Sequence, residues 1–335
     1  MTYSPMAVTI RDVASEANVS ATTVSRVFNH TDLVSPETVE RVRRIAERMG
    51  YEPNATAKSL SHGRTEAIGV VLPAPHGEFF SEIMRGIDDV AQDSEYYLLI
   101  SSSHYSLEEG EAAIRALRGR VDGLLVMTTH VRAKAMLEKR TPDVPVVFMN
   151  SAMAGTEHDA FDFENRKGAY KAVSHLLERG HRCLATITGP PDSYDVRERL
   201  SGLRKAVADT GLDPASVTHI QGDFTQASGY QAGKEILALD TLPDAVFACN
   251  DYMAIGAMSA LQEAGVRIPD DLAMAGFDDI PSARYASPSL TTISVPVYDL
   301  GRAAAKRLIA RVRGEHVPEA REKLFASELV IRSST

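Results

Sequence analysis

The fold of the first part of this chain is decided by one stretch, Val19-Ser20-Ala21-Thr22-Thr23-Val24-Ser25-Arg26-Val27-Phe28-Asn29. Ser20 is a residue type that caps helix N-termini, so the sequence predicts a helix from there through about Asn29. At roughly 100° per residue, Val24, Val27 and Phe28 share one side of this helix, which we expect to be buried. The outward side is polar and comprises Thr22, Ser25, Arg26 and Asn29, with Ala21 exposed in the first turn. Such a face suits a DNA groove, where arginine bonds guanine bidentately and alanine contacts the thymine methyl.

Two further helices are predicted beside this stretch. Thr9-Ile10-Arg11-Asp12 is a capping-box pattern that begins a helix running to about Ala17, and Asn18-Val19 forms a tight turn after it. Ser35-Pro36-Glu37 begins a third helix, whose apolar stripe continues to Gly50. Two helices joined by a short turn form a helix-turn-helix, whose second helix enters the major groove. The alternative is a three-helix dimerisation or docking module in which Arg26 forms a solvated ion pair.

The rest of the chain has a different pattern of apolar and polar residues. After a short polar segment (52–60) and a linker (61–65), apolar runs alternate with amphipathic segments, which predicts parallel α/β sheets. The runs form two series: 67–72, 97–100, 123–127 and 144–149, then 183–188, 217–221, 245–249 and 272–277. Two α/β lobes in tandem are therefore predicted. We expect the chain to cross between them near 161–164 and 292–297, before a late helix over 297–313.

Composition limits the class of protein. The chain has 335 residues, of which 44% are hydrophobic and 24% charged, so two or three folded domains are expected and a disordered chain is excluded. Residues 1–64 carry 8 basic and 7 acidic residues, whereas the remainder carries 28 and 38. The net charge of −9 therefore resides in the large part. It does not argue against nucleic-acid binding by the small part, provided that its cations lie on one face.

Several other classes find no support in the sequence. No run approaches the roughly 20 apolar residues of a membrane span, and residues 1–20 lack the regions of a signal peptide, so we expect a cytoplasmic protein without a membrane partner. Cys183 and Cys249 occur outside any CxxC pattern, and we expect both to pack as small buried hydrophobes. An enzyme is the rival class, but G-x-G-x-x-G after the first strand, G-x-x-x-x-G-K-[ST] and G-x-S-x-G are all missing. No catalytic residue, metal or cofactor is therefore predicted.

Four segments in the first part resemble, in order, the DNA-binding head and hinge of the lactose-repressor (LacI/GalR) family: VTIRDVA (8–14), VSATTVSRVFN (19–29), GYEPN (50–54) and AKSL (57–60). The resemblance continues through GDF (222–224), CNDYMAIG (249–256), GFDD (276–279) and PSLTTI (288–293), so it covers essentially the whole chain. It implies a small all-α helix-turn-helix head plus hinge helix, followed by a two-lobe α/β body similar to periplasmic binding proteins.

The domain boundaries expected from this resemblance are 1–52 for the DNA-binding head, 53–65 for the hinge helix and linker, and 66–335 for the effector-binding and dimerisation core. Within the core, lobe one is expected to comprise about 66–163 and 297–318. Lobe two is expected to comprise about 164–293 and 322–332.

The resemblance also implies which residues contact DNA. Ala21, Thr22 and Arg26 occupy base-reading positions. Phosphate or helix-terminus contacts are implied for Ser20, Thr23, Ser25 and Asn29. Thr9, Asn54, Ala57 and Leu60 complete the expected DNA-binding set. Segment 54–60 matches the family's hinge helix, in which a leucine, here Leu60, wedges into the central base step. The alternative is that Leu60 covers part of the surface of the body.

A ligand site between the lobes is implied as well. Its expected residues are Phe79, Phe80, Asn150, Asp195, Arg199, Phe224, Asn250 and Asp278. In parallel sheets ligands bind beyond the carboxyl ends of the strands, where the Asn250-Asp251 and Asp278-Asp279 pairs fall. A sugar is favoured because the Arg, Asn and Asp side chains among these residues can form hydrogen bonds with sugar hydroxyl groups. A purine stacked on the phenylalanine rings is the alternative. The structural alternatives are that Asn250 only caps a helix, that Phe79 or Phe80 belongs to the core, and that Arg199 is a surface residue of its helix.

The function expected from the sequence is that of a transcriptional repressor of carbohydrate-metabolism genes. It binds a pseudo-palindromic operator as a homodimer and is controlled by a small-molecule effector, whose sign of action the sequence leaves open. A solute-binding transport protein is the alternative from another class, but it requires export and has no use for a helix-turn-helix head.

Overall fold

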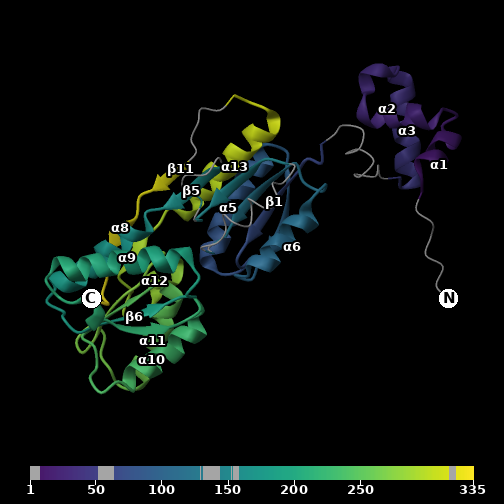
Figure 1. Cartoon of the computed structure of the whole chain (residues 1–335). Helices are drawn as coiled ribbons and strands as arrows, with labels where there is room; N and C mark the ends of the chain where they lie inside the picture. Colours follow the sequence, from purple (N-terminus) through teal and green to yellow (C-terminus); the bar gives the residue numbers. More distant parts are fainter. Residues whose placement is uncertain are drawn as a thin grey trace. The chain divides into compact units, whose positions relative to one another are not determined.

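The computed structural model of the chain describes residues 8–51, 64–128, 130, 144–151, 153, 158–316 and 322–335. Contacts between residues divide it into two units, Met1–Glu66 and Ala67–Thr335 (Figure 1). The predicted hinge helix, with Asn54, Ala57 and Leu60, lies outside the described residues. No helix among the described segments is long and apolar enough to cross a membrane.

The first unit is all helical, as predicted. It contains α1 (Ile10–Glu16), α2 (Ala21–Asn29), the 3-10 helix η1 (Thr31–Leu33) and α3 (Pro36–Met49). Its small core consists of side chains from all three α-helices and from the turn: Val13, Ala14, Ala17, Val24, Val27, Val42 and Ala46. The inward valines of α2 anticipated from helical periodicity are fully buried, and this fixes which face of α2 is turned outward.

The first lobe of the second unit is built on a six-stranded parallel sheet of order β11-β5-β4-β3-β1-β2. Its elements are β1 (Ala67–Leu72), α5 (Glu78–Asp93), β2 (Tyr97–Ser102), α6 (Leu107–Leu117), β3 (Gly123–Met127), β4 (Val146–Met149), β5 (Asp159–Phe163), α13 (Val297–Arg313) and β11 (Glu322–Phe325). Helices α5 and α13 pack against each other, and α13 also contacts β3, β4 and β5. The late helix thus returns to the first lobe.

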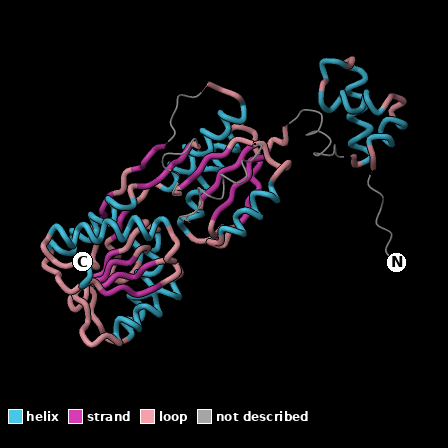
Figure 2. The backbone as a smooth tube through the Cα atoms, in the orientation of Figure 1, coloured by secondary structure: helices cyan, strands magenta, loops and turns pink. Residues whose placement is uncertain are grey.

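The second lobe holds a four-stranded parallel sheet of order β7-β6-β8-β9. Its elements are α8 (Asn165–Glu178), β6 (Leu184–Thr188), α9 (Tyr194–Asp209), η2 (Pro214–Ser216), β7 (Thr218–Gln221), α10 (Gln226–Leu237), β8 (Ala245–Ala248), α11 (Asp251–Glu263), β9 (Ala273–Ala275) and α12 (Pro281–Tyr285). An antiparallel pair, β10 (Thr292–Ser294) and β12 (Glu328–Val330), completes it. Figure 2 shows the strands of each sheet lying among helices.

Two expectations need correction. Residues 322–325 form β11, which pairs with β5, so this part of the segment 322–332 belongs to the first sheet and not to the second lobe. Cys183 is exposed, because it precedes β6 at the lobe surface, whereas Cys249 is buried as expected. Strand β2, predicted from the apolar run 97–100, lies at the edge of its sheet and leaves Tyr97 74% and Ile100 51% exposed.

Helices α10 and α11 approach each other closely because glycines lie at their contact. A Cβ on Gly229 would lie 2.2 Å from the Met253 carbonyl oxygen, and one on Gly256 would lie 2.1 Å from the Gln226 carbonyl oxygen. No side chain fits at these distances, so the packing of this helix pair depends on glycine. Helix α11 packs against β8 and α10 against β7, and the loops after these two strands carry part of the site described next.

Candidate functional site

The first candidate surface is the outward face of α2. Ser20 caps this helix: its Oγ accepts a hydrogen bond from the Thr23 backbone N–H at 3.0 Å and lies 2.9 Å from Thr23 Oγ1. The cap satisfies one of the free N–H groups of the first turn and fixes where the helix begins. The start of α2 is therefore held in a defined orientation on the small core.

The polar side chains of this face differ in exposure. Thr22 and Arg26 are exposed, whereas Thr23, Ser25 and Asn29 are partly buried. The apolar Ala21, which was expected to be exposed, is partly buried as well, because it lies at the start of α2 against the small core. Asn29 donates a hydrogen bond to Ser25 Oγ at 3.3 Å, which orients both side chains. Thr9 lies at the start of α1, where its N–H and hydroxyl both donate to Asp12 Oδ2 and thereby lower the pKa of that carboxyl group. The face can present an arginine and a threonine to base edges with hydroxyl and amide groups beside them.

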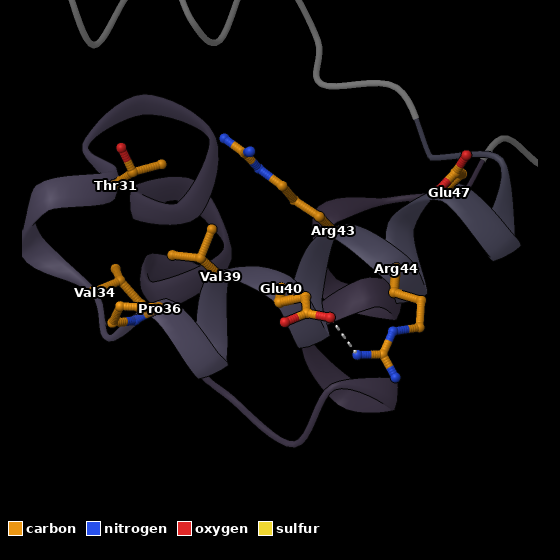
Figure 3. Close-up of a pocket in the computed structure, with 8 residues that line it drawn as sticks. All are labelled: Thr31, Val34, Pro36, Val39, Glu40, Arg43, Arg44 and Glu47. Carbon is orange, nitrogen blue, oxygen red and sulfur yellow. Dashed lines mark hydrogen bonds and ion pairs between the residues drawn. The ribbon is translucent and has the colours of Figure 1, made fainter.

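An open groove of about 580 Å³ lies between η1 and α3 in the same unit (Figure 3). Its lining consists of Thr31, Val34, Pro36, Val39, Glu40, Arg43, Arg44 and Glu47. Glu40 pairs with Arg44 at 3.3 Å across one turn of α3. The two acidic and two basic side chains balance each other in charge, and none of the residues expected to bind DNA or effector lies in this groove. We therefore assign it no ligand.

The second candidate site is a cleft of about 700 Å³ between the two lobes of the second unit. Seven of the eight expected ligand-site residues line it: Phe79, Phe80, Asp195, Arg199, Phe224, Asn250 and Asp278. They come from the first turn of α5, the first two turns of α9 and the loops after β7, β8 and β9. The cleft thus lies at the carboxyl ends of the parallel strands of both sheets, where the ligand-binding rule for such sheets places it.

Asn150 is the expected residue that does not line the cleft. It is 1% exposed and its Oδ1 accepts a hydrogen bond from Asn165 Nδ2 at 3.1 Å, so it lies in the layer behind the cleft wall. Lining side chains that the sequence reasoning missed include His76, His104, Tyr105, Met127 and Tyr252. His104, Tyr105 and Met127 lie at or just after the ends of β2 and β3, so the same strand-end rule applied to every strand would have found them.

Arg199 is the central cation of the cleft and is 3% exposed. Its Nε donates to Asn165 Oδ1 at 3.0 Å, one terminal nitrogen donates to the Cys249 carbonyl oxygen, and the other lies 3.4 Å from Asp278 Oδ1. The guanidinium also stands over the Phe277 ring, 3.8 Å from its centroid. These contacts leave Arg199 rigidly oriented and exclude the surface position that was its alternative.

Two buried carboxyl groups flank this arginine. Burial raises the pKa of Asp278 to about 7; Arg199 opposes the rise, and the nearby Asp195 adds to it. Burial raises the pKa of Asp195 to about 6, against the lowering effects of Arg199 and Asn150. Within the described chain, Asp195 Oδ1 and Asp278 Oδ1 are buried and make no hydrogen bond, although Arg199 lies 3.4 Å from Asp278 Oδ1 as its ion-pair partner. The cleft therefore contains more acceptor capacity than its own donors satisfy.

Asn250 caps a helix and also lies in the cleft lining. Its Oδ1 accepts from the Met253 N–H at 2.9 Å, which caps α11, while its Nδ2 donates to the Phe224 carbonyl oxygen at 3.0 Å. Its neighbour Asp251 does not line the cleft. Asp251 accepts from the Thr292 hydroxyl at 2.5 Å and from the Ile280 N–H at 3.0 Å, and so holds the loop that carries Asp278.

Aromatic rings form the less polar walls. Phe79 and Phe80 meet edge to face with centroids 5.3 Å apart, and Tyr105 from the first lobe lies 6.1 Å from Phe224 of the second. Tyr105, Phe224 and Asp278 have positive φ angles of 59°, 73° and 113°, which non-glycine residues rarely adopt. Strained backbone concentrated around one cleft is typical of a ligand-binding site. Among the described residues, no group of His, Cys, Asp and Glu is arranged to hold a metal ion.

Comparisons with known proteins agree with this architecture. Residues 9–54 match the model for bacterial regulatory proteins of the lacI family, and residues 173–335 match a periplasmic binding protein-like domain. The HTH-type transcriptional repressor PurR of Aliivibrio fischeri (strain MJ11) is 36% identical over 331 residues, which cover 97% of this chain and 98% of that protein.

Two solved structures are similar over the whole chain. One is a lac repressor dimer bound to operator and the anti-inducer ONPF, with a TM-score of 0.83, 30% identity and coverage of 98% of this chain and 99% of that one. The other is a complex of the transcriptional regulator CelR with cellobiose, with a TM-score of 0.71, 32% identity and coverage of 98% and 100%. The chain therefore belongs to the lacI family of bacterial regulatory proteins, a family of DNA-binding transcriptional repressors.

Proposed function

We propose that this repressor controls carbohydrate-metabolism genes and that its effector is a sugar bound in the cleft between the lobes. The observation that carries the proposal is that two buried carboxylate oxygens, Asp195 Oδ1 and Asp278 Oδ1, make no hydrogen bond within the described chain, although Arg199 lies 3.4 Å from Asp278 Oδ1 as its ion-pair partner. Such acceptors cost free energy until a donor reaches them. Sugar hydroxyls are suitable donors, and the rings of Phe79 and Phe224 offer faces to the C–H side of a sugar. The CelR–cellobiose complex supports the same ligand class.

A purine is the second candidate effector. The rings of Tyr105 and Phe224 come from opposite lobes, with centroids 6.1 Å apart and planes inclined by 35°. Rings placed this way suit contact with a flat base, and the N–H groups of a purine also donate to carboxylates. No catalytic role is proposed for the cleft, because its residues bind and orient without supplying a nucleophile beside a base.

For the operator, we propose that Ala21, Thr22 and Arg26 contact base edges. The phosphate-contacting set that we propose with them is Thr9, Ser20, Thr23, Ser25 and Asn29. The exposure of Thr22 and Arg26 supports this assignment. The hinge roles of Asn54, Ala57 and Leu60 rest on the sequence resemblance, as do the domain boundaries at 52/53 and 65/66. We propose a cytoplasmic location, because operator binding requires access to the DNA.

We also propose a homodimer as the operator-binding form. Two copies related by a two-fold axis match the two halves of a pseudo-palindromic site, and one head by itself makes too few specific contacts. The apolar edge formed by Tyr97, Leu99 and Ile100 on β2 supports this, because three large exposed hydrophobic side chains on a sheet edge favour burial against a partner.

Fluorescence anisotropy with labelled DNA from upstream of the protein's own gene tests the proposal, at fixed salt, against a panel of mono- and disaccharides and purines. We expect tight operator binding, and we expect one sugar of the panel either to weaken or to strengthen it. A coupling free energy of about 1–3 kcal/mol between the two sites changes operator affinity about 5–150-fold. A change produced only by a purine would replace the sugar with the second candidate. No change with any ligand would overturn effector control.

The matched variants for this assay are Arg26→Ala on α2 and Arg44→Ala on α3. Arg26→Ala is expected to lose about 1–3 kcal/mol of specific binding and to relax the preference for one base pair. Arg44 pairs with Glu40 on its own helix, so its removal is expected to leave sequence preference unchanged. Equal effects of both substitutions on base preference would contradict the role assigned to α2.

A further inference from the structure

The two lobes are connected by hydrogen bonds that lie outside the ligand cleft. Glu78 is the first residue of α5 in the first lobe, and Ser282 lies in α12 of the second. Glu78 Oε2 accepts from the Ser282 backbone N–H at 3.0 Å, and Glu78 Oε1 accepts from the Ser282 hydroxyl at 2.6 Å. Both oxygens of one carboxylate are thus engaged by one residue of the opposite lobe. Hydrogen bonds to a charged group are stronger than neutral ones.

A third bond joins the lobes at the same point. The Glu78 backbone N–H donates to the Tyr252 hydroxyl at 2.7 Å. The residue before it, Gly77, has a φ of +90°, and a Cβ there would lie 3.2 Å from the Tyr252 oxygen. Glycine therefore permits both the backbone turn and the close approach of the tyrosine.

The Glu78–Ser282 bonds are placed to control the geometry of the cleft from outside its lining. Neither Glu78 nor Ser282 lines the cleft, whereas Tyr252 and the next residue in the chain, Phe79, do. The position of Phe79 in one wall is therefore tied to Tyr252 in the other through Glu78. Glu78 and Ser282 are both half-buried, so water screens their interaction less than it would a fully exposed pair.

We propose that Glu78 and Ser282 form an inter-lobe clasp that holds the two walls of the cleft in register and thereby sets the affinity for the effector. The proposal rests on the proposed function only in placing the effector in this cleft. Glu78 is a positioning residue, because it acts through Phe79 and Tyr252. A ligand binds more weakly when the arrangement it requires is less populated, and this is the route by which loss of the clasp lowers affinity.

The test compares Glu78→Ala, Ser282→Ala and the double variant in the full chain by calorimetric titration with the sugar identified in the operator assay. We expect each single substitution to weaken sugar affinity by roughly 10-fold, and the double variant to be no weaker than Glu78→Ala, because the two residues act as one unit. Glu78→Gln keeps an acceptor oxygen and is expected to recover part of the loss. Thermal unfolding of each variant separates a change in affinity from a change in stability.

The matched control is Glu82→Ala. Glu82 lies one turn further along α5 and pairs with Arg85 of the same helix at 2.6 Å, so its removal leaves the inter-lobe contacts intact. We expect wild-type sugar affinity for this variant. Equal weakening by Glu82→Ala and Glu78→Ala, or additive effects of Glu78→Ala and Ser282→Ala, would overturn the clasp.

A second measurement does not depend on the effector. Spin labels on the exposed native Cys183 in the second lobe and on a cysteine replacing the exposed Glu108 in the first report the distance between the lobes. We expect Glu78→Ala and Ser282→Ala to broaden the distance distribution and Glu82→Ala to leave it unchanged. An unchanged distribution in all variants overturns the clasp. If Glu78→Ala and Ser282→Ala broaden the distance distribution but no sugar changes operator binding, the clasp is supported and the sugar effector is overturned.

Discussion

Arg199 shows how one side chain supports the whole cleft. It bonds Asn165, the Cys249 carbonyl and Asp278 while 3% exposed, so its loss leaves buried acidic groups without a compensating charge. We expect Arg199→Met to lower the free energy of unfolding of the second unit by about 3–5 kcal/mol, since removal of one partner of a buried pair costs that much. Urea unfolding followed by circular dichroism measures it.

The control for that prediction lies two residues earlier. The Arg197 side chain is 54% exposed and pairs with Glu198 at the surface, so Arg197→Met is expected to change the unfolding free energy by less than about 1 kcal/mol. A stability loss of the same size in both variants would show that Arg199 contributes no more than a surface residue.

Asp278 is expected to make affinity for the proposed effector depend on pH. Burial raises its pKa to about 7, so it is partly protonated near neutrality, and only the ionised form accepts hydrogen bonds with both oxygens. We expect sugar affinity to rise from about pH 6 to about pH 8 and binding to release protons. Titration calorimetry in buffers of different ionisation enthalpy detects that release, and Asp278→Asn is expected to abolish most of it. An affinity independent of pH in the wild type would contradict this role.

The same shift has a consequence for stability. In the unfolded chain Asp278 returns to its ordinary pKa near 3.8, so the folded state binds more protons between about pH 4 and about pH 7. The contribution of Asp278 to the free energy of unfolding therefore falls as the pH rises through this range. Asp195, with a pKa raised to about 6, acts in the same direction over a narrower range.

At the scale of elements, contact between helices α10 and α11 decides where the loop after β8 lies. A Cβ on Gly229 would lie 2.2 Å from the Met253 carbonyl oxygen, which is backbone and cannot move aside. We expect Gly229→Ala to destabilise the second unit by about 1–3 kcal/mol through overpacking, measured by thermal or urea unfolding.

Gly110 in α6 is the matched helical glycine. A Cβ there would meet only the Ser103 Cβ at 3.4 Å, an ordinary contact. Gly110→Ala is expected to be neutral or to stabilise the protein by up to about 1 kcal/mol, because alanine has the higher helix propensity. Destabilisation by Gly110→Ala as large as that by Gly229→Ala would show that helix contact does not explain the effect.

At the scale of the whole molecule, the proposed dimer requires a surface, and the edge strand β2 supplies one. We expect Tyr97→Lys combined with Ile100→Lys to shift the protein toward monomer in sedimentation velocity and to weaken operator binding in parallel, because charges replace apolar contacts. Leu324→Lys on β11, the opposite edge of the same sheet, is the control and is expected to stay dimeric. Unchanged sedimentation of the β2 variant would place the dimer interface elsewhere.

The sequence by itself determined the helix-turn-helix, the two α/β lobes and most of the cleft. Caps such as Ser20, the apolar periodicity of α2 and the alternation of strands and helices are local signals, read from residues a few positions apart. The strand-end rule, together with the family resemblance, brought seven of the eight expected cleft residues to one place. These features follow from the local conformational preferences of neighbouring residues and from the order of strands and helices along the chain.

Only the tertiary structure decided which side chains meet across large separations in the chain. It placed Asn150 behind the cleft wall, paired β11 with the first sheet, exposed Cys183 and joined Glu78 to Ser282, 204 positions away. Contacts of this kind depend on how the lobes pack and on which strand lies at an edge. No local pattern encodes them, because the same residue types occur equally well on a surface or in a core until packing selects between the two.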